Sequence, residues 1–537
     1  MAPYANLAIP PSLSRLSTVV LPPGPKTPSF LIGPSQKSYK HQYSNIYFIR
    51  LRLLRGFVEE NARRRWSVLA GKPVLVPRAL EVEKGKLCYV VGTIYMDMPL
   101  KPNVMDDIAR DQSIPAPPPP EKFYSPDDGI MLEDESGRIM LVGDRVKDAK
   151  LVTGVIVGAL GMETPTGEFE VIDLCYPEMA PQLIEADATE DKMDVDVPDE
   201  SADEWIAVVS GLDVGSASPS DVQIQLLTEY LVGEGGVVTD QVSAASISRL
   251  IIAGDSLAAT DPVVTEVIST IDDRKARRYG YDATNFSGHP VLSLSSTLTD
   301  IASALPIHIL PGETDPSGTI MPQQSFPRAM FGDAARYPTF SCETNPTYLA
   351  LASDMDDMDG DASSSKSRRP PVTRNILINS GQPLNDMFKY LPSPPNTRLS
   401  ILESTLRWRH MAPTAPDTLW CHPYFSEDPF LITETPEIYI VGGQKKFATK
   451  LVKEQQETTI KDGKPLRCRI VMIPSFAETG TLVLINLRTL AVRCINFSAF
   501  GMTTGGRVDV KEPVKTPSPT AEPVLLAPKS SAEEVVI

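Results

Sequence analysis

The chain has 537 residues, of which 51 are basic and 68 are acidic, so its formal net charge is −17. This length predicts two to four domains at roughly 100–200 residues each, and a hydrophobic content of 42% is enough for packed cores, which excludes disorder of the whole chain. The negative charge repels phosphate backbones, so we expect any nucleic acid to be held by a partner rather than by this chain.

Cysteine spacing and hydropathy narrow the class of protein further. The six cysteines include no CxxC pair, which argues against a zinc site and a disulfide framework and favours a reducing compartment, the cytosol or the nucleus. No stretch reaches the roughly 18 apolar residues of a membrane span. The Pro- and Ser-rich residues 1–33 do not have the charged and apolar segments of a secretory signal, so we expect neither membrane nor export.

The first 70 residues change sharply in composition. Residues 1–37 hold few large apolar side chains and many Pro and Ser, which predicts a disordered arm. Residues 38–70 are expected to be a helical segment, because apolar side chains recur at helical spacing among many arginines. These apolar residues are Phe48, Leu51, Leu54, Phe57 and Val58. Two interpretations stay open, a packing helix with solvated arginines and a docking or nucleic-acid-binding helix.

Residues 71–180 alternate with a period of two, which is typical of strands. We expect a strand over Leu87–Met98, a hairpin over Ile130–Val142 that turns at residues 135–137, and a second hairpin over Leu151–Tyr176 that turns at residues 166–167. About five strands in about 100 residues favour an OB-type β-barrel. Tyr89 and Tyr95 are the candidates for stacking on single-stranded DNA, but nearby acidic residues favour a packing module.

From residue 205 to residue 501 strands alternate with helices, after an acidic linker at 181–204. This pattern predicts an α/β layered domain whose strand ends gather ligands. The expected strands are Trp205–Ser210, Leu250–Ala253, Ile307–Leu310, Asn375–Asn379, Glu437–Val441 and a final hairpin over Cys468–Phe497. The expected helices are Val222–Val232, Ser293–Leu305, Leu384–Leu391 and Arg398–His410. Residues 353–369 and the tail 502–537 are expected to be disordered.

Four loops lie at the ends of these strands, at residues 210–215, 311–315, 379–382 and 442–445. They resemble the loops of calcineurin-type metallophosphoesterases with the metal ligands replaced. With three further segments, residues 152–154, 321–324 and 407–419, the chain resembles the second, B-type subunits of eukaryotic DNA polymerase delta from about Tyr43 to Gly501. The resemblance implies an α+β multi-domain fold, with an OB barrel and an inactivated phosphoesterase domain between disordered tails.

The resemblance also implies which positions have lost their chemistry. An active member has Asp-x-His in the first loop, Gly-Asp in the second, Gly-Asn-His-Asp or -Glu in the third, a histidine in the fourth and Gly-His-x-His in the last. The corresponding degenerate positions here are Gly211, Asp213, Asp255, Glu313, Thr314, Ser380, Gly443 and Lys445. Two carboxylates, Asp213 and Asp255, remain, with Glu313 as a third candidate, and no imidazole does. We therefore expect no catalytic residue, no metal and no cofactor.

The histidines of the chain support the same expectation. There are five, His41, His289, His308, His410 and His422, and none stands at a ligand position of the resembling family. His410 lies beside a turn after a predicted helix, and we expect it to have a structural role as a cap or a core hydrogen-bonding residue. A two-metal centre that needs nitrogen donors is hard to assemble from this set.

By resemblance, the chain is a non-catalytic accessory subunit in DNA replication and repair in the nucleus. The implied partners are the polymerase's catalytic subunit, through its cysteine-rich C-terminal region, and a third subunit, with the sliding clamp and DNA reached indirectly. Three alternatives are a residual metallophosphoesterase at Asp213 and Asp255, a single-stranded-DNA binder that uses the barrel, and the B-type subunit of another replicative polymerase.

Overall fold

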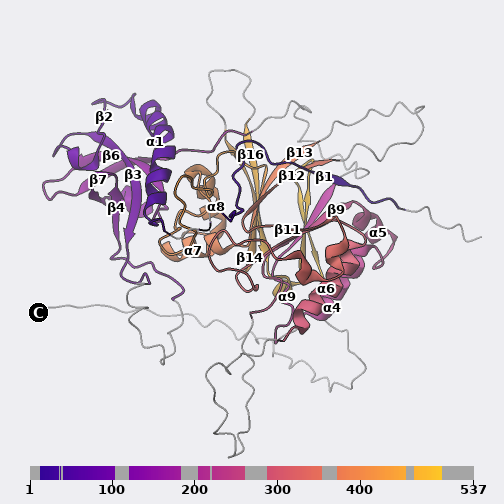
Figure 1. Cartoon of the computed structure of the whole chain (residues 1–537). Coiled ribbons are helices and arrows are strands. Elements are labelled where there is room, and N and C mark those ends of the chain that lie inside the picture. The colour runs from indigo at the N-terminus through magenta and orange to yellow at the C-terminus, as the bar shows by residue number, and fades with distance from the viewer. Residues whose placement is uncertain are drawn as a thin grey trace, which may run out of the picture. The chain divides into compact units, whose positions relative to one another are not determined.

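The computed structural model describes residues 13–34, 37, 40–102, 120–182, 204–217, 220–259, 287–353, 372–454 and 465–498 (Figure 1). The acidic linker beyond residue 182, the insertion from residue 354 onward and the tail 502–537 lie outside these ranges. Within them, no helix is both long and apolar enough to cross a bilayer.

The first module is a barrel of five strands, as the period of two predicted, and the short strand β2 pairs with β3 as a sixth strand of the sheet. The strand order is β2-β3-β4-β5-β7-β6, and β3 also pairs with β6, which closes the sheet. Both predicted hairpins are confirmed, with β4 paired to β5 and β6 paired to β7, each antiparallel. The elements are β2 (Val74–Leu75), η1 (Ala79–Glu81), β3 (Cys88–Asp97), β4 (Gly129–Glu133), β5 (Arg138–Val142), α3 (Asp144–Asp148), β6 (Ile156–Glu163) and β7 (Phe169–Cys175).

Helix α1 (Asn45–Trp66) confirms the predicted basic helix and packs on β3, β6 and β7. Leu54 and Val58 are buried against the barrel, as the spacing predicted. The prediction of its faces was wrong in two respects. Phe48 and Phe57 are about half exposed, at 53% and 48%, whereas Arg50 has no exposed surface. The reason is that the start of α1 contacts the second module as well as the barrel, so a second face of the helix is buried.

The second module contains two six-stranded sheets. One has the order β11-β10-β9-β8-β17-β18 and the other β1-β12-β13-β14-β16-β15. Strands β8, β9 and β10 run parallel, as do β13, β14 and β16, so each group has its carboxyl ends on one edge. The strands are β1 (Thr18–Leu21), β8 (Trp205–Val209), β9 (Ile247–Ala253), β10 (Ile307–Leu310), β11 (Phe340–Cys342), β12 (Thr347–Ser353), β13 (Thr373–Asn379), β14 (Ile438–Gln444), β15 (Ala448–Glu454), β16 (Leu466–Pro474), β17 (Thr481–Asn486) and β18 (Val492–Asn496).

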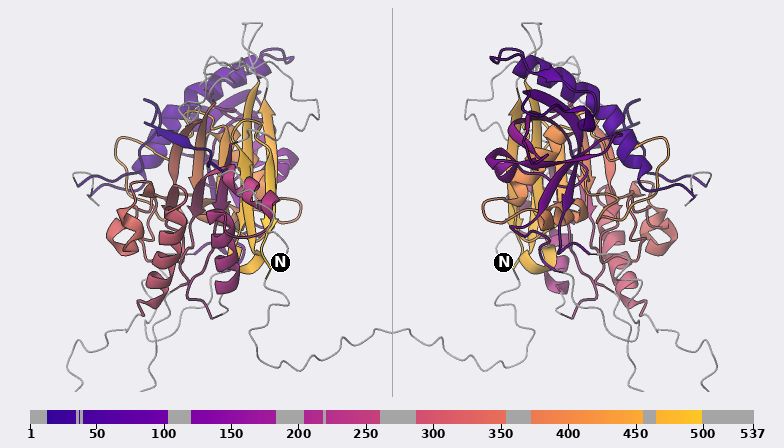
Figure 2. Two further views of the ribbon diagram at one scale, coloured as in Figure 1. Left: turned by 90° about the vertical axis from the view of Figure 1, so that its right-hand side faces the viewer. Right: turned by 90° about the vertical axis from the view of Figure 1, so that its left-hand side faces the viewer.

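Helices cover both outer faces of the paired sheets, and Figure 2 shows the strands side by side with helices outside them. An aliphatic core that includes Val208, Ile251, Ile378 and Ile440 fills the space between the sheets. The helices are α4 (Asp221–Val232), α5 (Val238–Ala245), α6 (His289–Ala302), η4 (Arg328–Phe331), η5 (Ala334–Arg336), α7 (Gln382–Tyr390), α8 (Arg398–Trp408) and α9 (Phe476–Thr479). Side chains of α4 and α6 pack on the first sheet, and side chains of α7 and α8 share a core with the second sheet and the barrel.

Two sequence predictions need correction. Residues 13–34 of the expected disordered arm 1–37 are part of the fold, because the β-branched Thr18–Val20 pair antiparallel with β12 and Phe30 is buried. The expected final hairpin over Cys468–Phe497 is divided between the sheets: β16 pairs with β14 and β15 in one sheet, and β17 and β18 form a hairpin in the other. Both β16 and β17 are apolar, largely buried strands, so their hydrophobicity did not reveal the change of sheet.

Candidate functional site

The loops that the sequence singled out meet at one edge of the two sheets. Each follows or ends a parallel strand, namely β8, β9, β10, β13 or β14. Main-chain and side-chain hydrogen bonds join them: Gly211 N–H to Gly254 O at 3.0 Å, Asp213 N–H to Asp255 O at 3.2 Å, Thr314 N–H to Asp255 Oδ1 at 3.1 Å and Gly443 N–H to Ser210 Oγ at 2.8 Å. The geometry therefore brings together the positions that the sequence predicted to be neighbours.

Close backbone contact leaves little space between these loops. A Cβ atom on Gly312 would lie 2.2 Å from the Asp255 backbone nitrogen. A Cβ atom on Gly443 would lie 2.6 Å from the Ser380 carbonyl oxygen, and Gly443 has a φ of +60°. Position 443 is one at which the sequence predicted the loss of a metal-ligating histidine. In this backbone conformation it has no room for any side chain.

A buried amide network occupies the region where imidazoles were expected. Asn345, with no exposed surface, directs Nδ2 at Gln323 Oε1 (2.7 Å), Ser380 Oγ (2.6 Å) and Gln382 Oε1 (3.0 Å). Its Oδ1 accepts a hydrogen bond from Ser380 N–H at 3.0 Å. Gln323 Nε2 in turn donates to Gly312 O at 2.9 Å. Hydrogen bonds between uncharged groups thus connect the loop 311–315 to the loop 379–382.

A second polar connection holds the last loop. Gln444 is 1% exposed; its Nε2 donates to Gly442 O at 2.8 Å and its Oε1 accepts from Arg398 Nη1 at 3.1 Å. The same Arg398 nitrogen lies 2.5 Å from Asn385 Oδ1. Sequence reasoning missed Asn345, Gln323 and Arg398, because amides and a helix-starting arginine match no catalytic motif.

The two retained carboxylates lie on left-handed backbone. Asp213 has a φ of +47° and Asp255 a φ of +56°, a conformation that non-glycine residues rarely adopt. Asp255 Oδ1 accepts from both the N–H (3.1 Å) and the hydroxyl (3.3 Å) of Thr314, the residue at a histidine position. Burial raises the pKa of Asp255, and burial together with the charges of Asp255 and Glu478 raises the pKa of Asp213.

The third carboxylate near the loops is Asp315, not Glu313. Asp315 is 5% exposed and accepts hydrogen bonds from the backbone of Ser256, Leu257 and Gly312. Burial raises its pKa to about 6. The side chains of Glu313 and Lys445 are exposed instead. In the part of the chain that the structure describes, no three His, Cys, Asp or Glu side chains are grouped closely enough to hold a metal ion.

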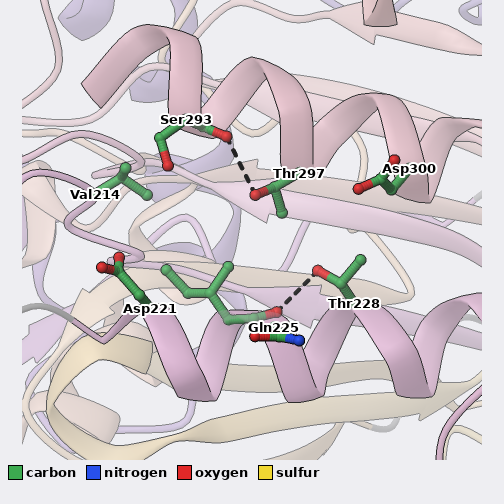
Figure 3. A pocket seen from close by; sticks show the side chains of 8 residues that line it. Val214, Asp221, Gln225, Thr228, Ser293, Thr297 and Asp300 are labelled. Atoms are coloured by element: carbon green, nitrogen blue, oxygen red, sulfur yellow. Dashed lines mark hydrogen bonds between the residues drawn. The ribbon is translucent and has the colours of Figure 1, made fainter. Parts of the chain in front are cut away.

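A pocket of about 150 Å³ lies between α4 and α6, beside the first loop (Figure 3). Its hydroxyl groups serve their own helices, because Thr228 Oγ1 donates to Ile224 O at 2.8 Å and Thr297 Oγ1 donates to Ser293 O at 3.2 Å. These two hydroxyls are thus spent on the helix backbone, and Gln225 Nε2 donates to Glu229 Oε1 on its own helix at 3.0 Å. This pocket does not have the arrangement of a catalytic site.

The barrel tyrosines are engaged in the fold. Tyr89 is 5% exposed and packs edge-on against Trp66, with ring centroids 5.2 Å apart. Tyr95 has two cations over its ring, Arg138 Cζ at 4.2 Å and Lys101 Nζ at 5.1 Å from the centroid. Neither ring is positioned as an open platform on which a DNA base could stack.

The barrel, α1 and the second module are joined by one buried guanidinium. Arg50 donates from Nε to Asp428 Oδ2 at 2.9 Å, from Nη1 to Pro413 O (2.7 Å) and Gly154 O (3.2 Å), and from Nη2 to Ala415 O (2.9 Å). Both side chains of the ion pair have no exposed surface. A Cβ on Gly154 would lie 2.0 Å from Pro413 O, so only glycine permits this approach. We call this cluster the joint.

His410 completes the joint in its neutral form. Its Nδ1 accepts from Ala412 N–H at 3.1 Å, so the ring proton is on Nε2 and is donated to Asp428 Oδ2 at 2.9 Å. A second proton on the ring would make Nδ1 a donor that faces the Ala412 N–H, so the charged form would lose this hydrogen bond. Burial, and then the charge of Arg50, lowers the pKa of His410 to about 4, while its neighbours hold the pKa of Asp428 far below the usual range. The expected structural role of His410 is confirmed.

This protonation state predicts a pH dependence of stability. Because the folded pKa of about 4 is below the usual 6.5, the unfolded chain takes up a proton first as the pH falls, so His410 costs stability between about pH 6.5 and 4. The cost is about 1.4 kcal/mol per pH unit within that window. Unfolding free energies of the wild type and His410→Gln, measured at pH 7, 6 and 5, should converge as the pH falls. Parallel curves would contradict the assigned neutral histidine.

Comparison with known proteins shows similarity over both modules. A family model described as the DNA polymerase delta subunit OB-fold domain matches residues 42–174, and one described as the B-type subunit of DNA polymerase alpha/epsilon matches residues 206–355 and 373–449. The DNA polymerase delta small subunit of Oryza sativa is 33% identical over 465 residues, covering 86% of this chain and 94% of the relative.

Two further relatives carry the same name. The DNA polymerase delta small subunit of Arabidopsis thaliana is 35% identical over 457 residues, which cover 85% of this chain and 91% of the relative. That of Saccharomyces cerevisiae is 31% identical over 505 residues, with coverage of 88% and 92%. The residues matched by the two family models include the barrel strands, the strand-end loops and the joint.

Proposed function

The chain belongs to the family of DNA polymerase delta small subunits and is an accessory subunit of the polymerase delta complex, and from this premise we propose that it acts there as a non-catalytic scaffold. Its phosphoesterase-like loops then serve to hold the two sheets in register. As a subunit of this polymerase, the chain works in DNA replication. The proposal also implies that it is located in the nucleus and takes part in DNA repair.

The observation that carries the proposal is the amide network at Asn345. A two-metal phosphoesterase needs ligands that converge on paired cations. Here Thr314 and Ser380, which stand at two histidine positions, donate to or accept from protein atoms, and position 443 has no room for a side chain. The loops are thus connected to one another by hydrogen bonds that require no ion.

As scaffold, the chain offers two modules fixed by the joint. We assign the helical segment to residues 38–70, the barrel to 71–180 and the phosphoesterase-like domain to 205–501, with the ordered part of the arm as an addition to the last. The partners we propose are the catalytic subunit, through its cysteine-rich C-terminal region, and the third subunit, with the clamp and DNA bound indirectly. Stable interfaces of this kind bury about 1,600 Å² or more.

Co-purification with metal analysis tests the proposal. The tagged chain should recover the other polymerase delta subunits, and the purified chain alone should hold less than about 0.1 equivalent of zinc, manganese or iron. Addition of a chelator should leave its melting temperature unchanged, because no ion is bound whose loss would destabilise the folded state. Stoichiometric metal together with manganese-dependent phosphodiester hydrolysis would contradict it.

A further inference from the structure

Residues 13–34 form a segment that we call the strap, and its first anchor is Arg15. The guanidinium donates to Ala244 O at 2.7 Å and Ile247 O at 2.8 Å from Nη1, and to Leu231 O at 2.5 Å from Nη2. Leu231 and Ala244 lie in the last turns of α4 and α5. Carbonyl groups at helix C-termini attract cations, so the charge of Arg15 is well placed.

The middle of the strap connects the two sheets. Strand β1 pairs with β12 of one sheet, while Arg249 on β9 of the other sheet donates to Thr18 O at 2.6 Å and to Thr18 Oγ1 at 3.2 Å. Arg249 is itself held by His308 Nε2 at 2.6 Å, and the opposite ring nitrogen lies 2.8 Å from Glu343 Oε1. The strap therefore bridges the sandwich at one edge.

The second anchor is Phe30, which is 4% exposed. Its ring stacks on Tyr348, with centroids 5.8 Å apart and planes within 7°, and lies 6.3 Å from the ring of Phe430. The side chain of Gln324 hydrogen-bonds the backbone on both sides of Leu31. Its Nε2 donates to Phe30 O and its Oε1 accepts from Ile32 N–H, each at 3.0 Å. Ring packing and two hydrogen bonds thus fix this end.

Contacts continue from Phe30 into the joint. The N–H of Phe430 donates to Asp428 Oδ1 at 3.1 Å, and the other carboxylate oxygen of Asp428 holds both Arg50 and His410. We propose that the strap braces the joint: the docking of Phe30 fixes the loop that carries Asp428, and this loop fixes α1 and the barrel against the second module. The inference adds to the scaffold function a device that sets the geometry between the two modules.

Hydrogen–deuterium exchange of the full-length chain tests the brace, with Phe30→Ala as the variant and Leu31→Ala as its matched control. Leu31 is adjacent but 65% exposed. In Phe30→Ala, hydrogen exchange at residues 428–432 and at the start of α1 should accelerate at least about tenfold. Loss of the ring leaves a cavity beside these residues, and the cavity lowers the free energy of local opening. The control should match the wild type. The strands β3 and β6 of the barrel should keep their protection, since the barrel itself is not altered.

Other patterns would overturn the inference. If acceleration is confined to β1 and β12, the strap only bridges the sheets. If it is uniform over the chain, Phe30 supports global stability and not the joint in particular. Should Phe30→Ala not fold, Phe30→Leu keeps part of the packing and should accelerate the same segments to a smaller extent; no acceleration there would equally reject the brace. Binding of partner subunits is not needed for this readout, so its failure leaves the scaffold proposal standing.

Discussion

Replacement of Arg50 by Met is expected to lower the unfolding free energy by about 3–5 kcal/mol, because it leaves the Asp428 carboxylate buried without its cationic partner. Four acceptors each lose one donor, namely Asp428 Oδ2, which keeps His410 Nε2–H, and the carbonyl oxygens of Gly154, Pro413 and Ala415. Two of these segments, around Gly154 and around Pro413, belong to different modules. The change should thus also loosen the contact between the two modules around Arg50, while the shared apolar core keeps them together. Hydrogen–deuterium exchange at residues 413–415 would detect the local loosening, and denaturant unfolding would measure the loss of stability.

Arg52 provides the matched control for this prediction. It lies two residues along the same helix and its side chain is exposed. Arg52→Met should change stability by less than about 0.5 kcal/mol, as is usual for surface positions. Equal effects of the two substitutions would show that the ion pair at Asp428 does not hold the joint.

Replacement of Asn345 by Asp should be the second severe change, with a loss of about 3 kcal/mol or more in unfolding free energy. The substitution keeps the shape of the side chain but replaces the donor Nδ2 by an acceptor that faces Gln323 Oε1, Ser380 Oγ and Gln382 Oε1. A charge at a fully buried position is costly when only one of its oxygens keeps a donor, here the N–H of Ser380, and the other faces acceptors. Thermal and denaturant unfolding measure the loss.

The corresponding control is Asn385→Asp. Asn385 accepts a hydrogen bond from Arg398 through Oδ1, so a carboxylate at this position meets a cation. The unfolding free energy of the Asn385→Asp variant should equal or exceed that of the wild type. If Asn345→Asp were as stable as the wild type and bound manganese, the region would be a cation site and the network interpretation would be wrong.

The barrel and the strand-end cluster could be predicted from sequence because local signals determine them. The turns at residues 135–137 and 166–167 interrupt runs with a period of two, which specifies the hairpins. Loops after parallel strands must gather at one edge, so Asp213, Asp255 and Thr314 were expected to be neighbours, and they are hydrogen-bonded.

Features that depend on distant residues could not be predicted in this way. Arg50 is buried only because Asp428, 378 positions further along the chain, meets it, and helical periodicity treats an arginine as solvated. Asn345 lies between β11 and β12 in no recognisable motif. The strap is rich in proline and serine, which predicts disorder, and single side chains such as Phe30 order it through contacts that composition does not record.

The most direct test of the central claim is the double variant Asp213→Asn, Asp255→Asn in a reconstituted polymerase delta complex. Asparagine tolerates the left-handed backbone of both positions, at φ +47° and +56°, so the fold is expected to persist. Because the retained carboxylates have no catalytic role in this account, complex assembly and the rate of DNA synthesis should equal those of the wild type. A phosphodiester hydrolysis present in the wild type and absent from the variant would contradict it.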